Sequence, residues 1–136
     1  MSNMDLVELE NAMVATNETI DFNVEHMFVD GMYIRTLYIP AGSVIVGKRH
    51  RHKTLNILLK GKMIINDGVE SYELEAPFMA ESLPYTKKAG HALEDSIWCN
   101  IHVTKETDLE KIEEEFIIPE EDYKNLLTHE ENICLG

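Results

Sequence analysis

Residues 47–61 read Gly-Lys-Arg-His-Arg-His-Lys-Thr-Leu-Asn-Ile-Leu-Leu-Lys-Gly, and the interpretation of the whole chain starts from this stretch. It contains an H-x-H pair, an apolar run rich in strand formers and a closing Lys-Gly turn. Because side chains alternate between the two faces of a strand, the pattern assigns each residue to a face. One face would carry His50, His52, Thr54, Asn56 and Leu58. The other would carry Arg49, Arg51, Lys53, Leu55, Ile57 and Leu59.

The H-x-H pair is a candidate metal site. His50 and His52 would point to the same side of a strand, and neutral imidazole nitrogen is a common ligand for divalent ions. The six positions from Lys48 to Lys53 also hold four of the twelve basic residues of the chain. The stretch therefore predicts a functional site, whose ligand is a metal ion, an anion or both.

Short apolar segments separated by Gly and Pro continue on both sides of this stretch. Residues 22–29 and 32–39 predict two strands joined at Asp30-Gly31, which is a strong hairpin signal. Further strands are expected at residues 43–46, 54–59, 63–65, 70–74, 77–80 and 96–103. Short strands at nearly regular spacing predict a small antiparallel sandwich or barrel.

The two ends of the chain are expected to differ from the middle. Residues 1–20 should form an arm or a short helix, and residues 21–104 the barrel. Residues 105–136 should form an acidic helical extension. In that extension Thr107-Asp108 would cap a helix that runs to Ile117, Pro119 would end it, and residues 120–127 would add one short helical turn.

Composition restricts the class of protein. A chain of 136 residues with 44% hydrophobic and 27% charged residues is expected to be one globular domain. The net charge of −13 argues against general nucleic-acid binding and against binding to an anionic membrane. The apolar runs are strand-length, and the first residues lack the features of a secretory signal. With Cys99 and Cys134 expected as reduced thiols, the prediction is a cytoplasmic protein without a membrane span.

The charges are unevenly distributed. Eight of the twelve basic residues lie between positions 48 and 88, whereas the acids gather in residues 5–25 and 106–131. The basic residues of this segment are Lys48, Arg49, Arg51, Lys53, Lys60, Lys62, Lys87 and Lys88. Two explanations stay open at this point: the protein's own acidic helix balances the basic segment, or an anionic ligand or an acidic neighbouring chain does so.

Four motifs in this order resemble the cupin superfamily over about residues 26–104. They are Tyr-Ile-Pro-Ala-Gly at 38–42, the H-x-H pair, Leu-Leu-Lys-Gly at 58–61 and Ala-Leu-Glu-Asp-Ser at 92–96. The full order of motifs, including Glu-Thr-Asp-Leu-Glu-Lys at 106–111, is similar to small cupin-like proteins of bacteriophages. The resemblance implies a mainly β chain that forms a single jelly-roll-like antiparallel β-barrel and is frequently a homo-oligomer. If the chain is phage-encoded, the expected location is the host cytoplasm. Cupins usually hold Fe, Mn, Ni or Zn with an H-x-H pair, a Glu and a second-motif His.

This sequence departs from that ligand set. The Glu position falls on Asn56, Ile57 or Thr54, depending on the alignment, and the position of the second-motif His is Lys88. His91 directly precedes Ala92, so it has the wrong phase for the role and is the weaker candidate ligand. In the last strand Ser96, Trp98, Asn100 and His102 share one face, which could line the barrel. His102 would then be a third metal ligand, although we favour the alternative that it ends the strand in solvent.

Three functions follow from these patterns. The first is binding, without turnover, of an anionic small molecule such as a signalling nucleotide or a phosphorylated metabolite. Its expected ligand-binding residues are Arg49, Arg51, Lys53, Asn56, Lys88 and Trp98. The second is a metal-dependent oxygenase, isomerase or lyase that uses His50, His52 and His102 or His91, although a site without metal is equally expected. The third is a structural or assembly protein.

Sulfur-containing residues are expected in the interior. Cys99 has the parity of Ile97 and Ile101, which predicts a buried thiol that packs as a small apolar group. Met side chains adapt to irregular gaps, so five of the seven methionines are expected to fill the core. These are Met13, Met27, Met32, Met63 and Met79.

Overall fold

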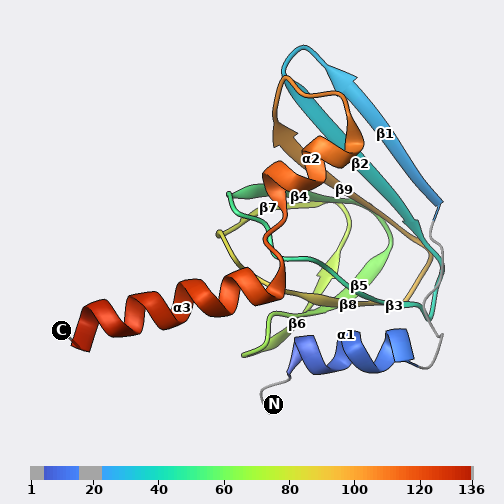
Figure 1. The fold of residues 1–136 in the computed structure, drawn as a ribbon. Coiled ribbons are helices and arrows are strands. Elements are labelled where there is room, and N and C mark those ends of the chain that lie inside the picture. Colours follow the sequence, from blue (N-terminus) through green and yellow to red (C-terminus); the bar gives the residue numbers. More distant parts are fainter. Residues whose placement is uncertain (1–4, 16–22, 136) are drawn as a thin grey trace.

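The computed structural model describes the backbone of residues 5–15 and 23–135, and the side chains of residues 5–12 and 23–128. The strands form two antiparallel sheets that face each other as a jelly roll (Figure 1). The five-stranded sheet has the order β1 (Asn23–Val29), β2 (Met32–Ile39), β9 (Ser96–Val103), β4 (Thr54–Lys60), β7 (Phe78–Ser82). The four-stranded sheet has the order β3 (Val44–Val46), β8 (Ala89–Ala92), β5 (Lys62–Asn66), β6 (Ser71–Glu75). The predicted mainly β, jelly-roll-like fold is confirmed.

Two turns show why the sequence forms these hairpins. Asp30 and Gly31 both have positive φ, 27° and 88°, and they join β1 to β2 in the register Val29 opposite Met32. This backbone conformation favours Gly and Asp, so the Asp-Gly hairpin is confirmed. Gly61 has a φ of 94°, and a Cβ atom there would overlap Ser96 and the carbonyl oxygen of Asp95. The turn between β4 and β5 therefore admits only glycine.

The core lies between the two sheets. It contains Leu37, Ile39, Leu58, Met63, Ile65, Leu74 and Ala92. A second buried cluster joins Tyr33 of β2 to Ile112 and Phe116 of α2 (Leu109–Phe116). The cap of α2 is as expected, because the side chain of Asp108 accepts a hydrogen bond from the backbone N–H of Glu110. The amphipathic pattern of this helix thus places α2 across one end of the barrel.

The other two helices lie at the ends of the described chain. The first helix, α1 (Leu6–Ala15), lies beside β3, and α3 (Glu120–Leu135) leads away from the barrel (Figure 1). The expectation of one short helical turn at residues 120–127 is wrong, because α3 continues to Leu135. Among the described residues, no helix is both long and apolar enough to cross a membrane.

The strand expected at residues 54–59 is present, but the assignment of residues 49–53 to the alternating faces of that strand is wrong. β4 begins at Thr54, and the residues before it form an irregular loop with one isolated bridge between His50 and Ile117. Tertiary hydrogen bonds hold this loop, because Gly47 N–H donates to the carbonyl of Lys88 and Arg51 N–H donates to the carbonyl of Phe116. The alternation of faces therefore does not extend back from Thr54.

The sulfur-containing residues are only partly in the interior. Cys99 is buried as expected, and so is Met63. The expectation of a core position is wrong for Met27, Met32 and Met79, which are 58%, 41% and 64% exposed. The side chains of Met13 and Cys134 lie outside the described residues.

Candidate functional site

A cavity of about 620 Å³ lies between the sheets and beneath α2. Its polar wall comes from the inner face of the five-stranded sheet. Strand register aligns His26, Arg35, Asn100 and Asn56 as successive cross-strand neighbours on β1, β2, β9 and β4, and all four line the cavity. The remaining wall is largely apolar and includes Leu37, Met63, Ile65 and Trp98. The cavity can thus accept a ligand with both a polar and an apolar part.

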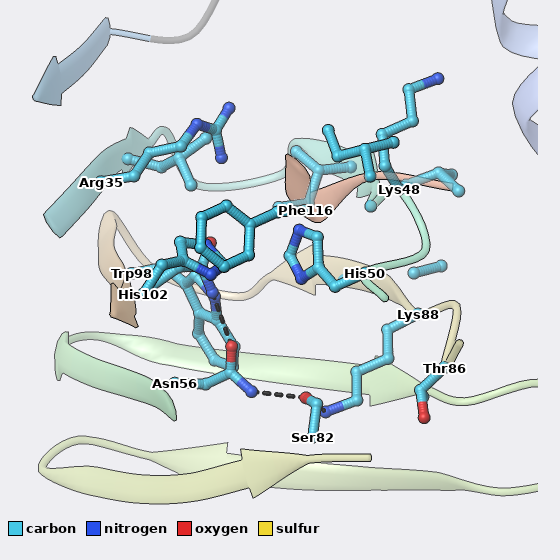
Figure 2. A pocket seen from close by; sticks show the side chains of 18 of the residues that line it. Arg35, Lys48, His50, Asn56, Ser82, Thr86, Lys88, Trp98, His102 and Phe116 are labelled. Atoms are coloured by element: carbon cyan, nitrogen blue, oxygen red, sulfur yellow. Dashed lines mark hydrogen bonds between the residues drawn. The ribbon is translucent and has the colours of Figure 1, made fainter. Parts of the chain in front are cut away.

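A chain of hydrogen bonds crosses the wall of the cavity (Figure 2). The Lys88 ammonium donates to the hydroxyl oxygen of Ser82 over 2.7 Å, and the amide of Asn56 donates to the same oxygen over 2.5 Å. The amide of Asn100 in turn donates to the carbonyl oxygen of Asn56 over 2.6 Å. Burial lowers the pKa of Lys88 from its ordinary value, although Asp67 acts in the opposite direction. These bonds fix the orientation of the polar groups that a ligand would meet.

Two neutral histidines lie next to this chain. The rings of His50 and His102 meet edge to face with centroids 5.0 Å apart, and Nδ1 of His50 lies 3.0 Å from the hydroxyl of Thr54. The ring of Phe116 packs against the ring of His102, with the two ring centroids 4.4 Å apart. Burial lowers the pKa of both histidines to about 4, and the positive charge of Arg35 acts in the same direction. Both rings are therefore uncharged at neutral pH.

His102 is more deeply buried than the sequence indicated. Its residue is 5% exposed, so the favoured expectation that it ends the strand in solvent is wrong. It lies on the face of β9 that also presents Trp98 and Asn100 to the cavity, as the alternation of residues 96–103 predicted. Within the described part of the chain, its Nδ1 atom is buried without a hydrogen-bond partner. Such an atom costs about 1–3 kcal/mol, so this end of the cavity is not optimised for stability.

Acidic helices neutralise much of the basic segment. The fully buried ammonium of Lys87 lies 3.1 Å from Glu10 of α1 and 3.0 Å from Glu120 of α3. Lys48 also pairs with Glu10, and Arg49 also pairs with Glu120. Burial raises the pKa of Glu120, but the hydrogen bonds from Lys87 and Arg49 outweigh this effect and hold it below its ordinary value. For Lys48, Arg49 and Lys87, the protein's own acidic helices therefore balance the charge of the basic segment.

Two cations of the cavity are not neutralised in this way. Arg35 and Lys88 line the cavity, and among the described residues neither has a carboxylate within 4.0 Å. Sequence reasoning missed Arg35. The signal was its alternation with Tyr33 and Leu37, which places a cation on a buried, otherwise apolar face of β2.

The structure separates the residues that the sequence grouped as ligand-binding. Asn56, Lys88 and Trp98 line the cavity. The basic residues of the loop, Arg49, Arg51 and Lys53, do not line it. Arg49 stacks over the ring of Tyr123 at 4.0 Å and pairs with Glu120, while Lys53 is exposed and lies 3.5 Å from Glu81.

The expected metal ligands do not converge. His50 and His102 line the cavity, whereas His52 is exposed and its ring centroid lies 5.9 Å from that of Phe116. His91 is exposed on β8. In the part of the chain that the structure describes, no three His, Cys, Asp or Glu side chains are placed to share one ion. The donor set therefore does not fit the usual four-ligand metal site of a cupin.

Two facing antiparallel sheets with a cavity lined from their inner faces define a small jelly-roll barrel. Solved structures with this arrangement include a cupin superfamily protein from Desulfitobacterium hafniense, which is 14% identical at a TM-score of 0.51 and covers 64% of this chain and 83% of its own. KdgF from Halomonas sp. is 16% identical at a TM-score of 0.54, with coverages of 68% and 94%. An RmlC-like cupin from Shewanella frigidimarina is 17% identical at a TM-score of 0.53, and the match covers 68% of this chain and 90% of that cupin.

These likenesses establish that the chain has the cupin fold. No protein-family model matches the sequence, and no curated protein matches it. The resemblance to phage proteins is not supported by these neighbours, which are bacterial.

Proposed function

We propose that the chain binds an anionic small molecule in the barrel cavity and does not turn it over. The observation that carries the proposal is the pair Arg35 and Lys88, two cations that line a cavity without a carboxylate within 4.0 Å among the described residues. A charge removed from water is costly unless it is paired, so an anion that enters the cavity gains two favourable partners. Two carboxylates also line the cavity: Glu113 is an exposed residue of α2, and Glu10 is paired with Lys48 and Lys87.

The lining supports a ligand with an apolar or aromatic body. The volume of about 620 Å³ lies within the range of small-molecule sites, about 300–1,000 Å³. Trp98 offers a ring face for stacking, and the neutral side chains of Asn56, Asn100 and His50 offer hydrogen bonds without charge. A signalling nucleotide or a phosphorylated metabolite combines these features, and its sequestration without turnover is the most specific form of the proposal.

The first experiment is native mass spectrometry and elemental analysis of one natively purified sample. A co-purified anionic compound that is recovered with unchanged mass after incubation supports binding without turnover. Stoichiometric Fe, Mn, Ni or Zn in the same sample would instead support the metal-dependent enzyme, with ligands at His50, His52, His102 or His91. A compound that is chemically altered during incubation would contradict binding without turnover.

The second experiment compares two arginines. Calorimetric titration with nucleoside monophosphates, cyclic dinucleotides and sugar phosphates identifies an anion that binds the wild type. Arg35→Gln should then weaken binding about 10–100-fold, because a hydrogen bond to a charged group contributes about 1.5–3 kcal/mol. The matched control Arg51→Gln, in the loop outside the cavity, should leave the affinity unchanged.

The opposite pattern would place the ligand at the loop. If Arg51→Gln weakens binding and Arg35→Gln does not, the cavity is not the site. If no compound co-purifies and none of these anions binds, the proposal of an anionic ligand fails.

A further inference from the structure

The two unneutralised cations of the cavity are held far apart. Arg35 belongs to β2, whereas the ammonium of Lys88 is anchored on Ser82 at the end of β7. In the five-stranded sheet, β9 and β4 lie between β2 and β7. Neighbouring strands are about 4.8 Å apart, so the two anchor points are roughly 14 Å apart across the sheet. Figure 2 accordingly shows Arg35 on the opposite side of the cavity from Lys88 and Ser82.

The two cations also have separate electrostatic surroundings. The charge of Arg35 lowers the pKa of both His50 and His102. The pKa of Lys88 is lowered by burial and raised by Asp67, without a contribution from Arg35. Two like charges at close range would each disfavour the charged form of the other. One phosphate or carboxylate group would therefore contact one of these cations and not both.

Uncharged amides occupy the wall between the cations. Asn100 and Asn56 are cross-strand neighbours on β9 and β4, and they are only 8% and 5% exposed. The amide of Asn100 uses one N–H for its bond to Asn56, so its second N–H and its carbonyl oxygen can bind a ligand. Neutral groups of this kind suit the hydroxyl, ether or amide groups of a ligand. The wall thus has a cation, neutral amides and a second cation in that order.

One other cation lines the cavity. The ammonium of Lys48 lies 2.9 Å from Glu10 of α1, and its side chain is 57% exposed. It is neutralised at the surface and does not offer a third anchor. Within the described part of the chain, the cavity therefore has two positions for acidic groups, one at Arg35 and one at Lys88.

We propose that the ligand is a bifunctional anion, a small molecule whose two acidic groups are separated by an uncharged polar spacer of roughly 10–14 Å, two to three strand spacings. This inference rests on the proposed function and specifies the class of ligand. One acidic group pairs with Arg35, the other pairs with Lys88, and the spacer lies along the amides. Once the first group is bound, the second binds at a high effective concentration, so the two contacts reinforce each other.

Calorimetric titration with phosphorylated ethylene glycol oligomers of increasing length tests the inference. Each oligomer is used with a phosphate at both ends and, as the matched ligand, with a phosphate at one end. Affinity for the bisphosphates should peak at an intermediate length, because a short spacer cannot span the cations and a long one lowers the effective concentration. At that length the bisphosphate should bind about 10–100-fold more tightly than its monophosphate, the effect of one additional charged hydrogen bond.

Substitution of either cation should remove this advantage. In Lys88→Gln, and separately in Arg35→Gln, the best bisphosphate should bind no more tightly than its monophosphate binds to the wild type. Both residues are partly exposed, so the variants are expected to fold, and circular dichroism checks this. The matched control Lys53→Gln removes an exposed cation outside the cavity and should leave both affinities unchanged.

The outcomes separate this inference from the proposed function. A bisphosphate that binds no more tightly than its monophosphate at every length overturns the inference, and so does a bisphosphate whose affinity survives Lys88→Gln. In either case, monophosphate binding that depends on Arg35 leaves the proposed function standing. Failure of the whole series to bind also overturns the inference, while the proposed function is decided by its own titration with nucleotides and sugar phosphates.

Discussion

Replacing both carboxylates around Lys87 is expected to destabilise the protein strongly. The side chain of Lys87 is 2% exposed, and its described ion-pair partners are Glu10 and Glu120. The double variant Glu10→Gln, Glu120→Gln keeps the shape and the hydrogen-bonding capacity of both groups but removes their charge. It leaves a buried ammonium without a counter-charge, a change that typically costs about 3–5 kcal/mol.

The exposure of the two carboxylates sets the value within this range. Glu10 and Glu120 are 16% and 27% exposed, so water already screens part of their attraction to Lys87. We therefore expect the lower end, about 3 kcal/mol. At an unfolding entropy of about 2.1 cal/mol/K per residue, a loss of this size lowers the Tm of this chain by roughly 10 °C.

Urea unfolding and differential scanning calorimetry measure both quantities. The sharper measurement adds Lys87→Met to the double variant, because it removes the buried charge as well. This triple variant should regain most of the lost stability, since apolar groups often replace a buried ion pair without loss. Glu81→Gln, which breaks the exposed pair with Lys53, is the matched control and should not change the Tm. A double variant as stable as the wild type, or a triple variant no better than the double, would falsify the assignment.

Two further predictions concern pH and a turn. His50 and His102 have a pKa of about 4 in the folded protein, against 6.5 for an ordinary histidine, so the unfolded chain binds more protons between these values. The free energy of unfolding should therefore fall as pH drops from 7 to 5, by roughly 1–2 kcal/mol per histidine. In urea titrations the His102→Phe variant should lose about half of this pH dependence. An unchanged dependence of stability on pH would contradict the burial of this ring. Gly61→Ala should cost at least about 2 kcal/mol, because φ is positive and the new Cβ meets Ser96. The control Gly42→Ala has a positive φ but open space, so it should cost only about 1–2 kcal/mol; equal losses by thermal unfolding would refute the steric argument.

The fold could be predicted because its signals are local. The Asp30-Gly31 turn, the glycine at position 61 and the cap at Asp108 each act over a few residues, and the structure contains all three. Alternation within 96–103 likewise placed Trp98 on the cavity side, because that segment is a regular strand throughout.

The site was harder to predict because distant contacts decide it. Residues 49–53 have strand-like alternation, but backbone hydrogen bonds to the end of α2 hold them as a loop. This turns His52 outward and leaves His50 in the cavity. Lys87 and Lys88 are adjacent in sequence, yet one is neutralised by two helices and the other lines the cavity. Nothing in the local sequence distinguishes them.

The direction of α3 affects the hydrodynamic behaviour of the protein. The helix has 16 residues and leads away from the barrel (Figure 1), so at 1.5 Å per residue it extends by about 24 Å. A compact chain of this length has a radius of gyration of only about 14 Å. The molecule is therefore asymmetric, and its friction in solution exceeds that of a sphere of equal mass. Elution volume alone would overstate the mass of one chain, whereas small-angle scattering should show the helix as a tail at long distances.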